Sequence, residues 1–130
     1  MSYVTSKNIC IAFGVAFLVA GLLGFVPNPL VAPGGIFEVN FMHNLVHVLT
    51  AGVFFFGASR SEAAARTTLQ AVGIAYVGVT ILGFIMKGNM LLGLVHINHA
   101  DKWLHAGLAL VIVAAGFGLP KPRSTETVST

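Results

Sequence analysis

Four long apolar segments restrict what this chain can fold into. They cover residues 9–26, 41–58, 69–86 and 104–119. Each approaches the ~20 residues that an α-helix needs to cross a hydrocarbon core of ~30 Å. All five prolines lie outside these segments, where they interrupt no helix. The pattern predicts four membrane-spanning helices.

Composition and charge agree with a membrane location. Only 8% of the residues are charged and 56% are hydrophobic, whereas soluble domains carry about 25% charged residues. With a cytoplasmic N-terminus, five of the seven basic residues lie on the inner side: Lys7, Arg60, Arg66, Lys121 and Arg123. This excess predicts that both termini are cytoplasmic. The topology then accounts for the net charge of +3, and we predict no nucleic-acid partner.

The chain contains an internal repeat. Residues 14–26 align without gaps on residues 73–85, and the identical pairs are Gly14/Gly73, Ala16/Ala75, Leu23/Leu82, Gly24/Gly83 and Phe25/Phe84. Polar residues repeat as well, because Asn40, His43 and His47 have the same spacing as Asn98, Asp101 and His105. We interpret the chain as a duplicated helical hairpin.

The repeat predicts the architecture. We expect an all-α, four-transmembrane-helix bundle made of two parallel-repeat helical hairpins, related by a pseudo-twofold axis along the membrane normal. The transmembrane domain is expected to cover residues 1–120, with repeats at about 9–58 and 67–119. Residues 121–130 are expected to form a disordered cytoplasmic tail.

A polar cluster is expected in the outer half of this bundle. Both polar triads lie in the first two turns of helices that enter from the outer side. The cluster comprises Asn40, His43, Asn44, His47, Asn98, Asp101 and His105. Because buried polar groups in lipid need partners, we expect the two triads to meet, with Asp101 accepting a histidine N–H.

The two motifs resemble those of a bacterial family of small four-helix integral membrane proteins whose domain has no known function. The first, Asn-x-x-His-Asn-Leu-x-His, matches residues 40–47, and the second, Asn-x-Ala-Asp-x-x-Leu-His, matches residues 98–105. The similarity covers nearly the whole chain, although Lys102 stands where the family often has a second Asn. The resemblance implies a multi-pass protein of the bacterial cytoplasmic (inner) membrane, and it implies no activity.

A structural role is the first interpretation of the polar cluster. Its members would form interhelical hydrogen bonds, and Asn40 and Asn98 would cap their helices. The chain would then be a non-enzymatic structural or interaction protein, such as an accessory subunit of a membrane complex. Its partners would be the lipid bilayer and other membrane-protein subunits or further copies of itself. We find no catalytic motif and therefore predict that it is not an enzyme.

Ligand binding is the alternative interpretation. His43, His47, Asp101 and His105 carry the donor atoms of a divalent-metal site. His47 and His105, which the repeat pairs, could instead ligate a haem from two helices. A proton relay would also use histidines and a carboxylate. We do not expect a complete proton path, because the inner halves of the predicted helices contain no acidic residue. A pH-sensing or small-molecule pocket formed by the same residues is a further alternative.

Overall fold

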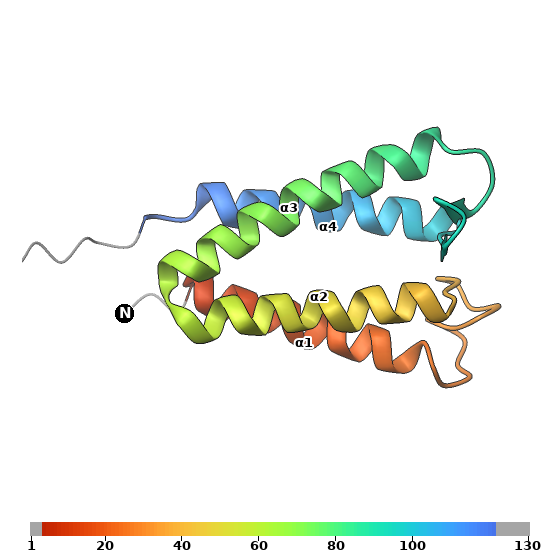
Figure 1. The fold of residues 1–130 in the computed structure, drawn as a ribbon, viewed down its shortest axis with the longest axis horizontal. Helices are drawn as coiled ribbons and strands as arrows, with labels where there is room; N and C mark the ends of the chain where they lie inside the picture. The colour runs from red at the N-terminus through yellow and green to blue at the C-terminus, as the bar shows by residue number, and fades with distance from the viewer. Residues whose placement is uncertain (1–3, 122–130) are drawn as a thin grey trace, which may run out of the picture.

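The computed structural model describes residues 4–121 and shows a bundle of four α-helices. The helices are α1 (Ser6–Leu23), α2 (Phe41–Arg60), α3 (Glu62–Ile85) and α4 (His99–Gly118). They alternate in direction, so that α2 and α4 begin at the same end of the bundle (Figure 1). The all-α prediction is confirmed, with one small addition. Strands β1 (Met90–Leu91) and β2 (Val95–His96) pair antiparallel in the connection before α4.

Each of the four helices begins directly after a polar capping residue. Asn40 and Asn98 each accept a hydrogen bond from the backbone N–H three residues later, as expected. Ser61 does the same for Ala64. Helix α3 starts at Glu62, well before the apolar segment 69–86, because hydropathy locates the lipid-spanning part of a helix and not its capped first turns. Helix α4 starts at His99, directly after Asn98, which was predicted to cap it.

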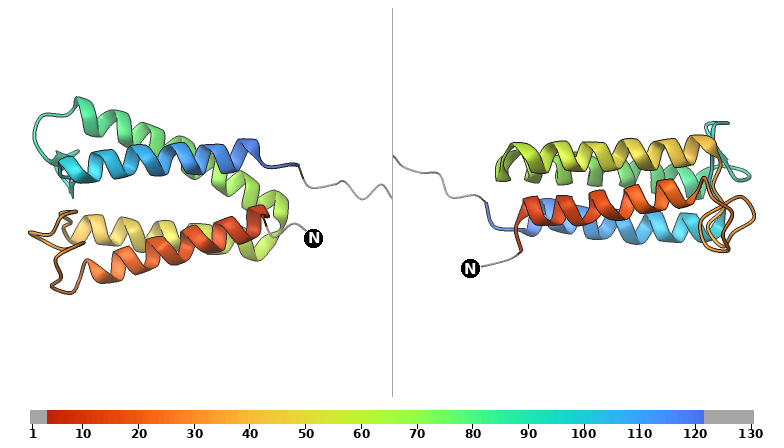
Figure 2. Two further views of the ribbon diagram at one scale, coloured as in Figure 1. Left: turned by 180° about the vertical axis from the view of Figure 1, so that it is seen from behind. Right: turned by 90° about the horizontal axis from the view of Figure 1, so that it is seen from below.

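Each helix packs mainly against its neighbour in sequence. Helix α1 lies along α2 and α3 lies along α4, so the bundle consists of two hairpins side by side (Figures 1 and 2). Helices α1 and α4 contact each other little. Between the hairpins lies an apolar core in which Phe54, Leu69 and Ile112 are fully buried.

The outer surfaces of the helices are apolar. All four helices are long and apolar enough to cross a membrane. Large hydrophobic side chains point outward, and they include Val19, Phe56, Ile74 and Leu110. Such a surface is stable in lipid and unfavourable in water. The protein is therefore a small membrane protein. The predicted tail lies outside the described residues, except for Lys121.

The end of the bundle that holds the chain termini is fastened by side chains of α3. The Glu62 carboxylate accepts hydrogen bonds from the backbone N–H groups of Ser6 and Lys7 at the start of α1. Arg66 donates to the carbonyl oxygens of Phe117 and Leu119 at the end of α4. The anion meets a helix N-terminus and the cation meets a C-terminus, which is the favourable arrangement at each helix end.

Candidate functional site

At the end of the bundle where α2 and α4 begin, the two capping asparagines join the two hairpins by hydrogen bonds. The Asn40 amide donates to the carbonyl oxygen of Leu94, in the loop between α3 and α4, at 2.8 Å. The Asn98 amide donates to the carbonyl oxygen of Ile36, in the loop between α1 and α2, at 2.9 Å. The repeat pairs Asn40 with Asn98, and the two acceptors, Ile36 and Leu94, each lie four residues before these asparagines, so the two bonds are equivalent. The pseudo-twofold axis itself stays a prediction, but the reciprocal bonds are what such an axis would produce.

Asp101 takes part in a local cap. Its carboxylate accepts the backbone N–H of Asn98 at 3.1 Å, and its own N–H donates to the Asn98 side chain at 3.0 Å. This is a reciprocal capping box at the start of α4. We expected Asp101 to accept a histidine N–H. Within residues 4–121, the hydrogen bonds of its carboxylate are made to α4's own first turn instead, because the local partner is fixed by the helix backbone.

Three histidines lie close together in the first two turns of α2 and α4, after these caps. His43 and His47 from α2 and His105 from α4 are 2%, 9% and 4% exposed. One ring nitrogen from each lies within 4.8 Å of the corresponding nitrogens of the other two. The His43 ring centroid is 4.4 Å from that of His47 and 5.6 Å from that of His105. The structure thus brings together three of the four predicted metal ligands and leaves Asp101 outside the trio.

The histidine trio is only partly satisfied by hydrogen bonds. The His43 Nδ1–H donates to the backbone carbonyl oxygen of His96 at 2.6 Å, which leaves Nε2 of His43 unprotonated. The Nδ1 atom of His47 is buried and has no hydrogen-bond partner among the described residues. The contact with His96 was not predictable from sequence spacing, because the acceptor is a backbone carbonyl in a loop.

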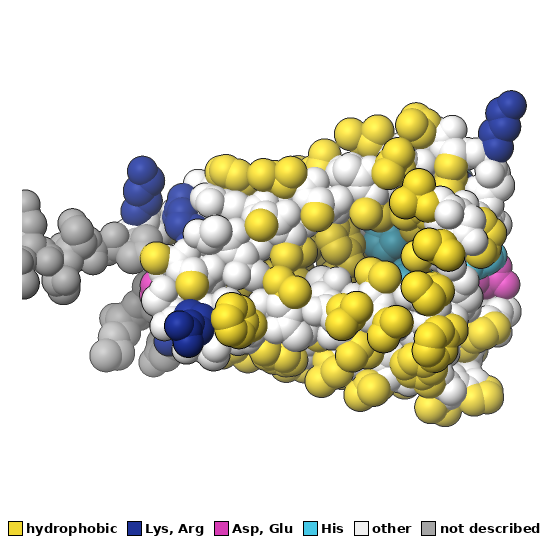
Figure 3. Space-filling model, viewed as in Figure 1, with side chains coloured by type: hydrophobic (Ala, Val, Ile, Leu, Met, Phe, Trp, Pro, Cys, Tyr) yellow, Lys and Arg dark blue, Asp and Glu magenta, His cyan; other side chains and the backbone are white. Residues whose placement is uncertain are grey.

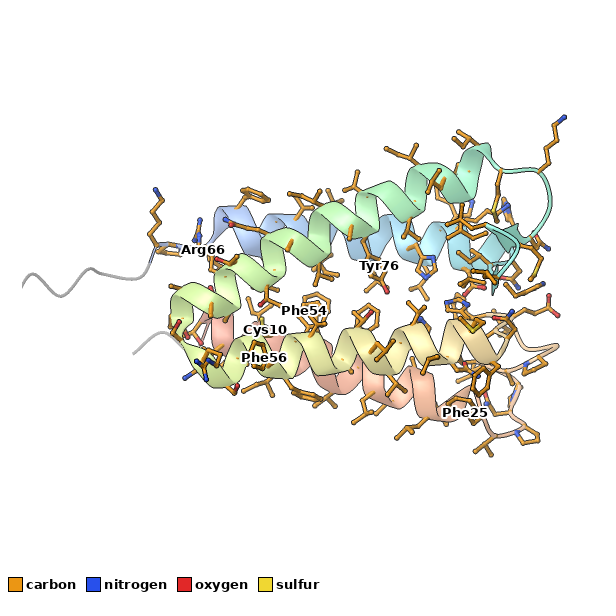
Figure 4. The ribbon with its side chains drawn as sticks, viewed as in Figure 1. Cys10, Phe25, Phe54, Phe56, Arg66 and Tyr76 are labelled. Carbon is orange, nitrogen blue, oxygen red and sulfur yellow. The ribbon has the colours of Figure 1, made fainter. Side chains whose placement is uncertain are left out.

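Aromatic side chains from the other two helices hold the histidine rings. Phe17 of α1 packs edge-on against His47 at 5.6 Å, and Tyr76 of α3 packs edge-on against His105 at the same distance. Phe17 and Tyr76 also touch each other at 5.4 Å. Figure 4 shows Tyr76 pointing from α3 into the space between the hairpins. Each helix of the bundle therefore contributes to the site.

Asn44, the remaining member of the predicted cluster, lies apart from the trio against α1. It is 2% exposed, and its side chain covers Gly24 so closely that no Cβ fits there. Its Oδ1 atom has no hydrogen-bond partner among residues 4–121. Asn44 therefore packs the first hairpin and takes no part in the histidine trio.

Two recesses open between the hairpins, one on each side. The α1–α4 pocket encloses about 200 Å³, and its lining includes Ala16, Phe17, His47, Asp101 and His105. The α2–α3 pocket encloses about 280 Å³ and is lined by Val46, Leu49, Thr50, Val53, Val72, Ala75, Tyr76 and Val79. Figure 3 shows a hollow between the hairpins on the side of α2 and α3, with histidine side chains at its floor.

The trio could hold a metal ion. Neutral imidazole is a ligand for zinc, copper, iron and nickel, and three histidines with one open position form a common zinc arrangement. Zinc–nitrogen bonds of about 2.0–2.1 Å place tetrahedral ligand atoms about 3.3 Å apart, so the three nitrogens, which lie within 4.8 Å of one another, would have to come closer together around an ion. The geometry does not favour haem, because the His43 ring lies against both His47 and His105 and leaves no gap for a macrocycle.

Fold and site together define a small four-helix membrane protein with a buried histidine trio. The chain belongs to a family described as a domain of unknown function (DUF4383), whose model matches residues 7–118. The family resemblance inferred from the two motifs is thereby confirmed. No curated protein and no solved structure matches the chain.

Proposed function

We propose that this protein binds one zinc or copper ion in the membrane through His43, His47 and His105. The observation that carries the proposal is the convergence of three buried ring nitrogens within 4.8 Å of one another. Buried polar atoms without partners are costly, and His47 Nδ1 has none. A structural role alone would leave that cost uncompensated, whereas a bound ion converts converging lone pairs into bonds.

The surroundings of the trio suit this role. The His43 ring is oriented by a hydrogen bond from its second nitrogen to a backbone carbonyl, which is the usual support for a metal-bound histidine. Phe17 and Tyr76 restrict the other two rings. The Asp101 carboxylate lines the same pocket as His47 and His105 and would offset part of the charge of an ion. We assign binding to this site and no reaction.

The structural role predicted for the polar cluster belongs, in this proposal, to the asparagines and Asp101. Their side chains cap α2 and α4 and join the two loops. The two interpretations of the cluster therefore apply to different residues within it. Association with other membrane subunits, or between copies of the chain, stays a prediction.

Metal titration tests the proposal. Protein without a histidine tag is purified in detergent, stripped with a chelator and titrated separately with Zn²⁺ and Cu²⁺ while bound metal is measured. We expect one equivalent to bind to the wild type, with affinity reduced at least ~100-fold in His47→Gln and His105→Gln. His99→Gln is the control, because His99 is exposed and lies outside the trio. Equal losses in all three variants, or no stoichiometric binding to the wild type, would refute the proposal.

Orientation in the membrane is a separate proposal. The trio lies near the end of the bundle where α2 and α4 begin, and the excess of basic residues at the other end favours a cytoplasmic position for that other end. We therefore expect the trio in the outer half of the bilayer. In a Cys10→Ala background, Ser61→Cys should react with a membrane-impermeant maleimide only after the cells are opened. Labelling of intact cells would reverse the orientation.

A further inference from the structure

The turn between β1 and β2 carries a residue that its backbone conformation disfavours. The Leu94 N–H donates to the carbonyl oxygen of Leu91 at 3.0 Å. Between them, Leu92 and Gly93 have φ values of 51° and 70°. Turns with positive φ at both central positions favour Asn or Asp followed by Gly. Within residues 4–121, Leu92 is the only non-glycine residue with positive φ, and a bulky side chain is rare there. Local turn preference therefore does not explain this leucine.

The side chain of Leu92 also projects away from the rest of the protein. It is 78% exposed, which is the highest value for a large hydrophobic residue in the described part of the chain. Met90 and Leu94 are exposed as well, whereas Leu91 is buried. The hairpin thus carries an apolar tip, which we define as Met90, Leu92 and Leu94. Exposed apolar surface of this kind is unfavourable in water and marks a contact with lipid or protein.

Hydrogen bonds fix the level at which the β1–β2 hairpin lies. The His43 ring donates to the carbonyl oxygen of His96, and the His96 N–H donates to the Asn40 side chain at 3.2 Å. Strand β2 therefore lies beside the first turn of α2, at the end of the bundle where α2 and α4 begin (Figure 1). Helix α2 is apolar and long enough to cross a membrane, so its first turn lies where the hydrocarbon core meets the lipid headgroups. The hairpin is then at the level of the headgroups.

Other residues at this end suit a membrane interface. Phe84 and Trp103 are exposed and pack edge-on, with ring centroids 5.1 Å apart, and tryptophan is enriched where a membrane meets water. Lys87 is exposed just after the end of α3, and Lys102 donates to the carbonyl oxygen of Gly88 at 3.3 Å. Long cationic side chains at such positions reach the polar headgroups. This combination of aromatic and cationic residues favours lipid over protein as the partner of the apolar tip.

We propose that the apolar tip inserts into the headgroup region of the adjacent leaflet and anchors this end of the bundle to lipid. Lipid then covers Leu92, which explains why an exposed leucine stands at a turn position that favours asparagine. The backbone of a two-stranded hairpin limits the depth of insertion. Its outer N–H and C=O groups need water or headgroup oxygens as partners, and the hydrocarbon core supplies neither. The proposal does not depend on whether the histidine trio binds an ion.

Fluorescence quenching in lipid nanodiscs tests the insertion. Cys10, the only native cysteine, is replaced by alanine in the full chain, and an NBD fluorophore is attached at Leu92→Cys. Leu94→Cys is a second position in the apolar tip, in case Leu92→Cys does not fold. Lys87→Cys is the matched control, because Lys87 is exposed in the same connection between α3 and α4. Each phosphatidylcholine nanodisc holds one copy, so only lipid can cover the label, and thermal unfolding shows which variants fold.

Two quenchers report opposite environments. One is phosphatidylcholine with a nitroxide near the headgroup end of an acyl chain, and the other is iodide in water. We expect the nitroxide lipid to quench the label in the apolar tip at least ~threefold more than at Lys87→Cys, with the reverse order for iodide, because interfacial anchors reach about 5–10 Å into the boundary between headgroups and acyl chains. Equal quenching at the tip and the control, or stronger iodide quenching at the tip, would overturn the proposal and leave the tip free for a protein partner.

Discussion

The two pockets between the hairpins occupy equivalent places and differ in chemistry. Positions paired by the repeat line both: Ala16 and Phe17 in the α1–α4 pocket correspond to Ala75 and Tyr76 in the α2–α3 pocket. The lining of the first pocket includes His47, His105 and Asp101, whereas the second has Thr50 and Tyr76 as its polar lining residues. The same backbone arrangement thus makes two recesses that are lined by different side chains.

The difference arises at a few positions. His47 and His105 are paired by the repeat, yet both line the α1–α4 pocket. Asp101 corresponds to His43, so the repeat places a carboxylate in one hairpin where the other has an imidazole. The trio therefore takes two histidines from α2 and one from α4 and is asymmetric.

The largest effect is expected where the two hairpins differ in packing. Gly24 and Gly83 are paired by the repeat, but Asn44 covers Gly24 while the nearest atom to a Cβ at Gly83 would be Lys102 Cγ, at 3.7 Å. Gly24→Ala should destabilise the protein by about 1–3 kcal/mol through overpacking. Gly83→Ala should be neutral, or stabilising by up to about 1 kcal/mol through helix propensity. Thermal unfolding in detergent measures both, and similar midpoints for the two variants would contradict the comparison.

The capping box at the start of α4 should come second in magnitude. Asp101→Leu leaves the partly buried N–H of Asn98 without its acceptor and removes a negative charge from a helix N-terminus, at a cost of about 1–2 kcal/mol. Lys102→Leu removes an exposed hydrogen bond to Gly88 and should change stability by less than about 0.5 kcal/mol. Chemical denaturation of the two variants provides the measurement. Equal losses would mean that Asp101 is not held in the cap.

The smallest difference is expected between the two asparagines, where the hairpins behave alike. Asn40→Ala and Asn98→Ala each remove a helix cap and one bond to the opposite loop. Each should cost about 1 kcal/mol or somewhat more. Similar values would strengthen the case for the pseudo-twofold axis. A difference of more than ~1 kcal/mol would show that the two halves are not equivalent at this end of the bundle.

The sequence predicted those parts of the molecule that follow local rules. Apolar length located all four helices, and the capping preference of asparagine identified the starts of α2 and α4. The matching spacing of the triads placed His47 and His105 at similar depth, and both belong to the trio in the structure.

The hydrogen bonds of Asp101 and His43 and the two pockets depend on three-dimensional contacts that the sequence spacing does not determine. Asp101 was predicted to meet a histidine, but the backbone N–H of Asn98 is always within its reach once α4 forms. The bond from His43 to the His96 carbonyl requires the β1–β2 hairpin to fold back over α2, and no spacing in the sequence encodes that. The pockets likewise depend on how far α1 stands from α4.

The coordination of a bound ion tests the central claim most directly. X-ray absorption at the zinc or copper edge, recorded on protein loaded with one equivalent, reports the type and number of ligand atoms. We expect a shell containing three imidazole nitrogens, at about 2.0–2.1 Å for zinc, falling to two in His105→Ala. A shell of oxygen atoms alone, or a spectrum unchanged in His105→Ala, would contradict the assignment of His43, His47 and His105 as a metal centre.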